Sequence, residues 1–437
     1  MKKIKNKKVY IGLSIDILHH GHINLINEAK KYGDLIVGLY TDKAIVQKKR
    51  LPLISYDNRK KILENINGIK KIIPQGQWEY CSNLKKIKPD FMVHGDDWKI
   101  NDQNLRSKTI QTLKKINAKL IEVPFTKNIS SSALNERMFS QNTLPSNRMS
   151  SLKRMIDSGK FCRIIETHSP LAALIAENTY LRNKDGSKNE FDGFWSSSLT
   201  DSTLKGKPDI EVLGINQRLL NITEIFDITS KPLIMDVDTG GKLEHFEINV
   251  KTIQNTGVSA LIVEDKKGLK KNSLFGNEVK QEQEDKDYFA KKIKAGRSAR
   301  ISEDFMVIAR IESRILEKGL QDAMERANSY VEAGDDGIMI HSRQEIPDEI
   351  FNFSKKFREY HKSVPLISVP SSYNKVKENE LIDNGFNVVI YANHMLRAAY
   401  PAMYKVAESI LKNGRSFEAD NELMKIKKIL ELIPGAK

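Results

Sequence analysis

Residues 233–241 read LIMDVDTGG, and residues 260–273 read ALIVEDKKGLKKNS. Each stretch is a short apolar run that ends in acidic side chains, which is typical of a buried strand of a parallel sheet. Six similar runs flank them: FCRIIET (161–167), FDGFWSS (191–197), MVIARIE (306–312), GIMIHS (337–342), PLISVP (365–370) and NVVIYAN (387–393). Most are followed by a helical pattern. Eight strand–helix units in roughly 280 residues predict a (β/α)8 barrel of the TIM type, whose chemistry lies at the carboxyl ends of the strands.

Acidic residues stand at three successive strand ends of this predicted barrel. Asp236 and Asp238 are two residues apart, which directs both carboxylates to one side of an extended strand. Glu264 and Asp265 end the next strand, and Asp209 follows the second one. Such carboxylates suit a hard cation, so we expect them to hold Mg²⁺ directly or through water. The alternative is that acids simply favour the loops that follow strands.

Cationic and hydrogen-bonding side chains occupy the same predicted edge: Lys270, Asn272, Ser273, Arg310 and His341. An arginine inside an apolar barrel strand is costly to bury without an anionic partner. A substrate carboxylate or phosphoryl group would supply that partner for Arg310. The alternative is a structural ion pair with Glu312 on the same strand.

Six sequence segments carry a family resemblance through their order and spacing: WSSSL, DVDTGG, EDKKGLKKNS, ARIES, MIHS and NHMLR. Over roughly residues 150 to 412 they resemble the phosphoenolpyruvate mutase branch of the isocitrate lyase superfamily. The resemblance implies an isomerase that converts phosphoenolpyruvate to phosphonopyruvate and so forms a P–C bond. The absence of a cysteine from the loop at 266–277 argues against the lyases of the superfamily. The KKNS tetrapeptide favours a mutase over a phosphonopyruvate hydrolase, which usually has another residue in place of Asn272.

The same resemblance implies roles for individual residues of the barrel. Asp236 would bind Mg²⁺ directly, and Asp209, Asp238 and Glu264 would hold it through water. The substrate carboxylate would lie against Trp195, Ser197, Ser198 and Arg310. Lys270, Asn272 and Ser273 would belong to a catalytic gating loop, with His341 near the transferred group.

Residues 8–137 show a second pattern, in which short predicted strands alternate with amphipathic helices. The strand candidates are VYIGLSI (9–15), DLIVGLY (34–40), KKIIP (70–74), DFMVHG (90–95) and KLIEVP (119–124), with helices from His20 and over residues 58–66. This βαβ alternation predicts a doubly wound, Rossmann-like domain. Residues 138–150 gather Ser, Asn and Pro and lose periodicity, as expected of a connector. We therefore expect domains at 1–137 and 151–437, joined by a linker at 138–150.

The first predicted strand is followed by DILHHGHINL (16–25), which contains an HxGH motif formed by His19 and His22. A tight turn at a helix N-terminus is suited to a phosphate, and the two imidazoles could donate to it. Metal ligation by the two histidines is the alternative. Further candidates are Lys48, Arg59, the HGDDW turn with Asp96 and Asp97, and the NISSSALNER loop with its three serines.

This set of motifs resembles the cytidylyltransferases of the glycerol-3-phosphate type, with Ser131 and Ser132 where that family prefers threonine. The resemblance implies that His19, His22 and Lys48 stabilise the α-phosphate of CTP, with Mg²⁺ as the cofactor of this domain too. Residues expected to contact CTP are His19, His22, Lys48, Arg59, Asp96, Asp97, Ser130, Ser131 and Ser132.

The order of the two domains resembles the two-domain enzyme of the fosfomycin pathway. It implies that CMP is transferred from CTP to a later phosphonate such as 2-hydroxyethylphosphonate. Three alternatives stay open: a phosphonopyruvate hydrolase barrel, a cytidylyltransferase for a phosphate ester such as glycerol-3-phosphate, and an N-terminal module that binds CTP without turnover. The superfamily resemblance also implies a homodimer or homotetramer that exchanges the helix after the eighth strand.

Bulk composition excludes several other classes. The formal net charge of +15 comes from lysines scattered without aromatic interleaving, so nucleic acid is not an expected partner. Neither a signal peptide nor a membrane span is expected from the N-terminal MKKIKNKK and the run after it, which favours a cytoplasmic protein. With only Cys81 and Cys162 in the chain, a disulfide framework or structural zinc site is not expected.

Overall fold

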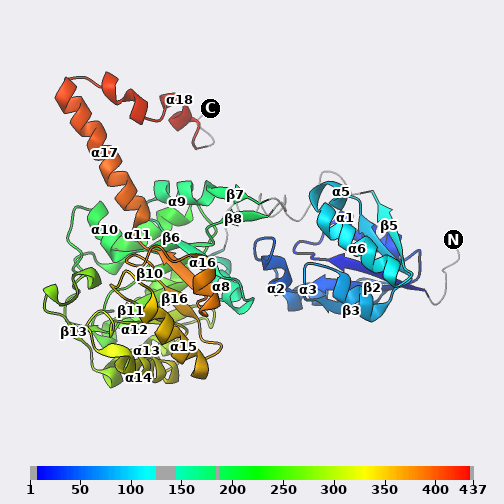
Figure 1. Ribbon diagram of the computed structural model, residues 1–437, viewed down its shortest axis with the longest axis horizontal. Coiled ribbons are helices and arrows are strands. Elements are labelled where there is room, and N and C mark those ends of the chain that lie inside the picture. The colour runs from blue at the N-terminus through cyan, green and yellow to red at the C-terminus, as the bar shows by residue number, and fades with distance from the viewer. Residues whose placement is uncertain (1–6, 125–143, 184–186, 434–437) are drawn as a thin grey trace.

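The computed structural model describes residues 7–124, 144–183 and 187–433, which form two α/β units (Figure 1). The predicted phosphate loop with Ser130, Ser131 and Ser132 lies outside the described residues. Among the described helices, none combines the length and apolar character needed to cross a bilayer.

The N-terminal unit is a five-stranded parallel sheet in the order β3-β2-β1-β4-β5. The strands are β1 (Lys8–Leu13), β2 (Asp34–Tyr40), β3 (Ile69–Gln75), β4 (Phe91–Gly95) and β5 (Lys119–Val123). Each coincides with one of the five predicted strands, and this confirms the doubly wound sheet. Strand order reverses between β1 and β4, the point at which open α/β sheets bind ligands. The HxGH motif follows β1 and the HGDDW turn follows β4, so both motifs flank this crevice.

Helices cover both faces of this sheet, which explains its apolar strands. Along β1, Val9 and Ile11 pack into one core cluster, while Tyr10 packs into the cluster on the opposite face. The principal helices are α1 (His20–Ala29), α3 (Tyr56–Glu64), α4 (Cys81–Ile87) and α6 (Gln103–Lys115). Burial on both faces replaces the apolar–polar alternation of a half-exposed strand by a continuous apolar run.

The larger unit is a closed barrel in the order β10-β11-β14-β15-β16-β17-β6-β9. Its strands are β6 (Cys162–Glu166), β9 (Gly193–Ser196), β10 (Leu233–Asp236), β11 (Ala260–Glu264), β14 (Met306–Ile311), β15 (Ile338–Ile340), β16 (Leu366–Ser368) and β17 (Val388–Tyr391). All eight predicted strands are present, and every neighbouring pair is parallel. Alternate side chains fill the interior and the layer beneath the helices, as Ile234 and Met235 do. The barrel is therefore a packed core with its site at one end.

Helix α8 (Pro145–Asp157) covers the amino ends of the barrel strands. Leu152, Met155 and Ile156 pack with the residues of the barrel interior. Arg148 is buried, with its guanidinium 3.9 Å from the centre of the Phe226 ring. The helix begins inside the stretch that the sequence indicates as a connector, because Pro145 can start a helix as readily as it can punctuate a loop.

Helix α17 (His394–Asn413) follows the last barrel strand and projects away from the barrel (Figure 1). None of its residues is buried. It ends at Gly414, whose φ of 62° is the left-handed conformation favoured at a helix C-terminus. Helix α18 (Ile426–Leu430) follows it.

Candidate active sites

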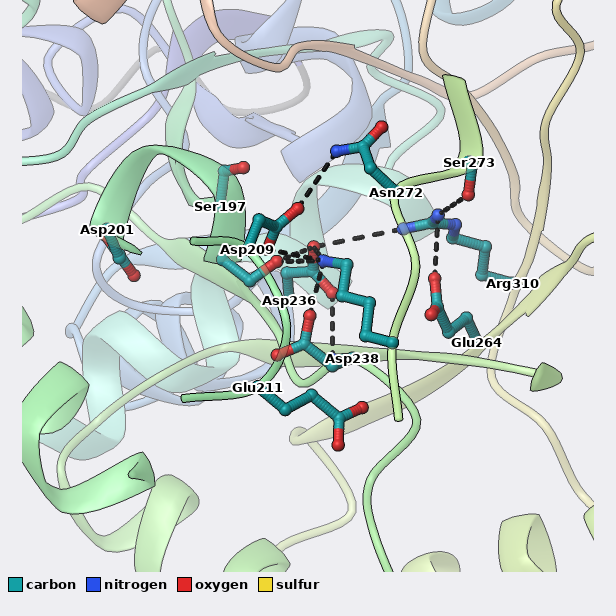
Figure 2. A network of polar contacts seen from close by, with 12 residues as sticks. Ser197, Asp201, Asp209, Glu211, Asp236, Asp238, Glu264, Asn272, Ser273 and Arg310 are labelled. Atoms are coloured by element: carbon teal, nitrogen blue, oxygen red, sulfur yellow. Dashed lines mark hydrogen bonds and ion pairs between the residues drawn. The ribbon is translucent and has the colours of Figure 1, made fainter. Parts of the chain in front are cut away.

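Carboxylates from neighbouring barrel loops converge on the ammonium group of Lys270. Figure 2 shows three of these acids, Asp209, Asp236 and Asp238, close together. Its Nζ lies 2.5 Å from Asp238 Oδ1, 3.3 Å from Asp209 Oδ1 and 3.6 Å from Asp236 Oδ2. Asp209, Asp236 and Asp238 cluster as predicted, whereas Asp265 accepts hydrogen bonds from Arg326 and Tyr330 and does not line the cavity. Strand alternation is the wrong reason for Asp238. Strand β10 ends at Asp236, and Asp238 lies in the following turn with a φ of 55°. The turn, held by Asp238 N–H donating to Asp236 Oδ1 at 3.0 Å, directs the second carboxylate.

The donor set of this cluster has the chemistry that Mg²⁺ requires. All four predicted ligands offer carboxylate oxygens, the preferred partners of a hard cation. Three buried oxygens of these ligands, both of Glu264 and Asp209 Oδ1, accept no hydrogen bond. Within the described ranges, no group of three or more acidic, histidine or cysteine side chains has the geometry of a metal site. Lys270 lies among the acids instead, 2.5 Å from Asp238 Oδ1. The residues present fit the ion chemically, and their individual ligand roles remain predictions.

Arg310 projects from β14 into the same cluster. Its Nη2 lies 2.8 Å from Glu264 Oε2, its Nε donates to Glu312 Oε1 at 2.5 Å, and Nη2 donates to Ser273 Oγ at 2.5 Å. The ion pair with Glu312, weighed from sequence as an alternative to substrate binding, is therefore present. Burial opposes the charge of Arg310, but Glu312 and Glu264 outweigh it and raise the pKa of the guanidinium. The site thus holds a permanent cation that also lines the cavity.

The buried acids differ in their proton affinity. Burial raises the pKa of Glu264 to about 7, although Arg310 and Lys266 oppose the shift. For Asp236, burial is outweighed by Lys270 and Arg310, and the pKa falls below its ordinary value. Of Glu264 and Asp236, Asp236 is therefore the carboxylate that stays ionised. It is also the residue predicted to bind the metal directly.

The predicted gating loop is folded over this cavity. Lys270 donates to Ser198 Oγ, and Asn272 Nδ2 donates to Asp209 Oδ2 at 3.0 Å. Ser273 opens the short helix η1 (Ser273–Glu278) and donates to Glu312 Oε2 at 2.7 Å. The loop thus connects residues that follow three different barrel strands, and it closes the carboxyl end of the barrel.

The cavity beneath the loop brings together most of the predicted barrel residues. It is lined by Trp195, Ser197, Asp209, Asp236, Lys270, Asn272, Ser273, Arg310 and His341. Ser198 lies beside it and donates to Asp236 Oδ2 at 3.1 Å. His341 Nδ1 lies 3.6 Å from Glu312 Oε1, and burial lowers the pKa of the imidazole despite that neighbour. His341 is therefore neutral near pH 7.

In the N-terminal unit, the two histidines of the HxGH motif form the start of α1. His19 Nδ1 accepts from Gly21 N–H at 3.2 Å, and His22 Nδ1 accepts from His19 N–H at 3.3 Å. Their ring centres lie 3.8 Å apart. Because each Nδ1 accepts, the network assigns the proton of each ring to Nε2, which leaves an N–H to donate to a phosphate. No third histidine, cysteine or acid of the described chain completes a metal site with them.

The loop between α2 (Asp42–Val46) and α3 carries two adjacent lysines, Lys48 and Lys49. The Lys49 ammonium lies 5.6 Å from the centre of the Trp78 ring. The pKa of His22 is lowered to about 4, first by burial, then by His19 and by the charge of Lys49. The role of Lys48 at CTP stays a prediction. Arg59 is fully buried and donates to Ser14 and Ile54 carbonyls and to Asp42.

The HGDDW turn is held at the carboxyl end of β4 by buried aromatic packing. Asp97 precedes the short helix α5 (Trp98–Asn101), and the Trp98 ring stacks on His94 with centres 3.7 Å apart. Asp96 N–H donates to the Val123 carbonyl at 2.9 Å, which ties the turn to β5. Both predicted aspartates thus lie at the carboxyl end of β4, on the opposite side of the switch point from the histidines.

Comparison with known proteins agrees with this geometry. Residues 152–411 match the phosphoenolpyruvate phosphomutase family, and residues 10–137 match the cytidylyltransferase-like family. The chain belongs to the phosphoenolpyruvate phosphomutase family. Its phosphomutase barrel is 33% identical over 282 residues to a phosphoenolpyruvate phosphomutase of Tetrahymena pyriformis, covering 64% of this chain and 89% of that protein.

Two further relatives bear on the two units of this phosphomutase-family chain. A crystal structure of phosphonopyruvate hydrolase in complex with oxalate and Mg²⁺ is 35% identical, with a TM-score of 0.56 over 64% of this chain and 93% of that one. A glycerol-3-phosphate cytidylyltransferase of Bacillus spizizenii is 44% identical over 95 residues, covering 21% of this chain and 74% of that protein. The barrel is thus of the mutase and hydrolase type, and it follows a cytidylyltransferase-like domain.

One residue that organises the barrel site was missed by sequence reasoning. Arg218 of α11 (Ile215–Phe226) is buried, and it donates to Asp201 Oδ2 at 2.8 Å and to the Asp236 carbonyl. It also donates to Ser196 Oγ at 3.1 Å, so it joins the ends of β9 and β10. A single arginine in an amphipathic helix carries no local signal of this role, because its partners come from distant segments.

Proposed function

We propose that the barrel isomerises phosphoenolpyruvate to phosphonopyruvate. The observation that carries this proposal is the gating loop, which closes the cavity and places Asn272 within hydrogen-bonding distance of Asp209. In the reaction the P–O bond to the enol oxygen breaks, and C3 of the resulting enolate forms a bond to the same phosphorus. A bound Mg²⁺ would supply charge stabilisation for the enolate and carboxylate oxygens.

The residues of the chain would stabilise the substrate charge, orient the phosphoryl group and exclude water from it. Arg310 is permanently cationic and would hold the anionic substrate. Asn272 would orient the phosphoryl group through its amide as the enolate turns beneath it. A loose, metaphosphate-like transition state needs positioning more than proton transfer, and a closed loop protects it from hydrolysis. Neutral His341 would act as a hydrogen-bonding group without adding charge.

A phosphonopyruvate hydrolase is the competing function for the barrel, since relatives of both activities have similar identity to it. Incubation with phosphonopyruvate and Mg²⁺, followed by ³¹P NMR, separates them. A mutase converts the phosphonate signal to that of phosphoenolpyruvate. Accumulation of inorganic phosphate with pyruvate would instead establish hydrolysis.

For the N-terminal domain, we propose transfer of CMP from CTP to a phosphonate made downstream of the barrel, such as 2-hydroxyethylphosphonate. The arrangement of His19 and His22, with Nε2 protons free to donate and Lys49 nearby, supports in-line attack at the α-phosphorus with loss of pyrophosphate. Mg²⁺ is the expected cofactor of this step and would neutralise charge on the nucleotide phosphates. The acceptor oxygen forms the new P–O bond as the bond to the β-phosphate oxygen breaks.

A panel of acceptors tests this second activity. Pyrophosphate release from CTP is measured with phosphonates and with phosphate esters, including glycerol-3-phosphate, against a His22→Asn control. Release with phosphonates supports the proposal, and release with phosphate esters alone overturns it in favour of the second candidate acceptor. Tight CTP binding without pyrophosphate release by any acceptor would indicate a nucleotide-binding module.

A further inference from the structure

The loop that carries Lys49 also contacts the barrel. This docking loop comprises residues 47–54, between α2 and α3. Arg50 donates to both carboxylate oxygens of Glu190, at 2.9 Å and 2.6 Å, and lies 3.4 Å from Glu177. Glu190 ends the strand β8 (Lys188–Glu190) and is also approached at 3.3 Å by Lys231. The bidentate geometry fixes the direction of the arginine as well as its distance.

A second barrel residue holds the backbone of the docking loop. Arg154 of α8 donates to the Pro52 carbonyl at 2.8 Å and to the Leu53 carbonyl at 3.2 Å. Its Nη2 also lies 3.4 Å from Asp42 at the start of α2. The Leu51 side chain packs against the apolar cluster of the barrel interior, next to α8. Figure 1 shows α2 and α3 on the side of the N-terminal unit that faces α8.

The other side of the docking loop is tied to the cytidylyltransferase-like crevice. Ile54 N–H donates to Asp16 Oδ1 at 3.0 Å, and the Ile54 carbonyl accepts from Arg59 at 3.0 Å. Asp16 opens the segment that carries His19. Arg59 reaches Asp42 at 2.6 Å, the same carboxylate that Arg154 contacts. Barrel residues and crevice residues therefore hold one loop from its two sides.

We propose that the barrel is a positioning element for the nucleotide site, in which Glu190 and Arg154 hold the docking loop, and with it Lys48 and Lys49, against the crevice that carries the HxGH histidines. The idea rests on the proposed cytidylyltransferase function. A loop held in this way has already lost its conformational freedom, so CTP binding does not have to order it. Neither Glu190 nor Arg154 faces the crevice itself, so both are positioning residues rather than catalytic ones.

The physical consequence is a change in CTP affinity. A lysine that contacts nucleotide phosphates in both the ground state and the transition state contributes to binding throughout the reaction. Freeing its loop is therefore expected to raise KM for CTP about 5- to 10-fold and to change kcat less than about 3-fold. The mutase activity, whose residues lie at the opposite end of the barrel, is expected to stay unchanged.

The test uses the full chain with Glu190→Gln and Arg154→Met, and Glu378→Gln as the matched control. Glu378 forms another ion pair of the barrel, 2.5 Å from Arg163, outside the docking loop. Hydrogen exchange of residues 47–54 reports whether the loop is released, and mutase turnover reports whether the barrel is folded. Arg154→Lys tests rescue by a second cation should Arg154→Met fold poorly.

An epistasis measurement separates positioning from general destabilisation. In a background that combines Lys48→Met and Lys49→Met, Glu190→Gln is expected to add no further increase in KM for CTP, because the cationic groups that it positions are already absent. Faster exchange of the loop with an unchanged KM in both single variants would overturn the inference. Equal effects of Glu190→Gln with and without the two lysines would do the same.

Failure of the proposed activity gives a different result. If the wild-type chain releases no pyrophosphate with any acceptor, the proposed function fails, and the same comparison is made on the Kd for CTP by calorimetry. A wild-type chain that binds CTP and turns it over, with constants insensitive to Glu190 and Arg154, contradicts the positioning role alone. A wild-type chain that does not bind CTP overturns both.

Discussion

Lys270 Nζ lies 2.5 Å from Asp238 Oδ1, within the group of carboxylates that has the chemistry of a magnesium site. The same ammonium is within 3.6 Å of Asp236 and within 3.3 Å of Asp209. Burial opposes the charge of Lys270, but the surrounding carboxylates, Asp236 foremost, outweigh it and raise the pKa of the ammonium. A residue of the gating loop therefore satisfies the charges that a divalent cation would satisfy, and the two are expected to compete.

Replacing Lys270 by Met is accordingly expected to tighten binding of a divalent cation. Removal of one positive charge from the carboxylate cluster should lower the Kd for Mn²⁺ about 10-fold, the equivalent of about 1.4 kcal/mol. Electron paramagnetic resonance of free Mn²⁺ measures this constant in the absence of substrate. Mutase turnover should fall in the same variant, because the gating loop loses its anchor.

Lys271→Met is the matched control for this measurement, since Lys271 lies in the same loop with an exposed side chain. Its Mn²⁺ affinity should equal that of the wild type. Weaker or unchanged Mn²⁺ binding by Lys270→Met would show that the ammonium does not compete with the ion.

Asn272→Ala should lower mutase kcat by about 100-fold, because misplacing the phosphoryl group by a small distance is enough to lose such a factor. Its amide donates to Asp209 at 3.0 Å, and its Oδ1 accepts from Leu274 N–H at 3.0 Å. A coupled assay for phosphoenolpyruvate formation measures the rate. Asn277→Ala, at an exposed position of η1, should leave it intact. Mutase turnover that survives Asn272→Ala would refute the assigned role.

Arg218→Met should destabilise the barrel by about 3–5 kcal/mol, because Asp201 would be left as a buried charge without its partner. The two side chains are only 3% and 4% exposed. Thermal unfolding followed by Trp195 fluorescence measures the change. The double variant with Asp201→Asn should recover part of the loss, since the uncompensated charge is then removed. Equal stability of the single and double variants would mean that charge pairing is not the cause.

The pH dependence of the N-terminal domain should depend on His22. The pKa of this imidazole is lowered from 6.5 to about 4, first by burial and then by His19 and Lys49. Between these two values the unfolded chain binds a proton that the folded domain does not, so stability falls as the pH drops through this window. His22→Asn should therefore reduce the stability lost between pH 7 and pH 5, by about 2 kcal/mol.

Urea unfolding at the two pH values, followed by the fluorescence of Trp78 and Trp98, measures this effect. His245→Asn is the control, since His245 is exposed on a barrel helix. An identical pH dependence of the wild type and His22→Asn would show that the imidazole titrates normally.

Helix α17 should be covered by a second copy of this chain. Tyr400, Met403, Tyr404 and Leu411 are between 58% and 85% exposed, an apolar surface of the kind that marks a contact between proteins. We expect a dimer or tetramer of the 49.8 kDa chain by light scattering. Met403→Glu combined with Leu411→Glu should dissociate it, whereas Glu408→Lys on the same helix should not. A wild-type chain that is monomeric at micromolar concentration would contradict the prediction.

The sequence by itself was sufficient for both folds and for most of the barrel cavity. Apolar runs such as LIMDVD report burial on both faces of a strand, and their polar ends report the edge where parallel strands meet. Local patterns of this kind need no knowledge of distant contacts. For this reason all eight barrel strands and the convergence of Asp236, Asp238 and Asp209 on one point could be predicted.

Only the tertiary structure decided which partners the charged residues take. It placed Lys270 among the carboxylates, and it brought Arg218 of one helix to the ends of two strands. It also joined Arg50 to Glu190, which is 140 residues away along the chain. Hydrophobic periodicity determines which face of an element is buried, whereas ion pairs and hydrogen bonds depend on distances between elements that only the packed chain brings together.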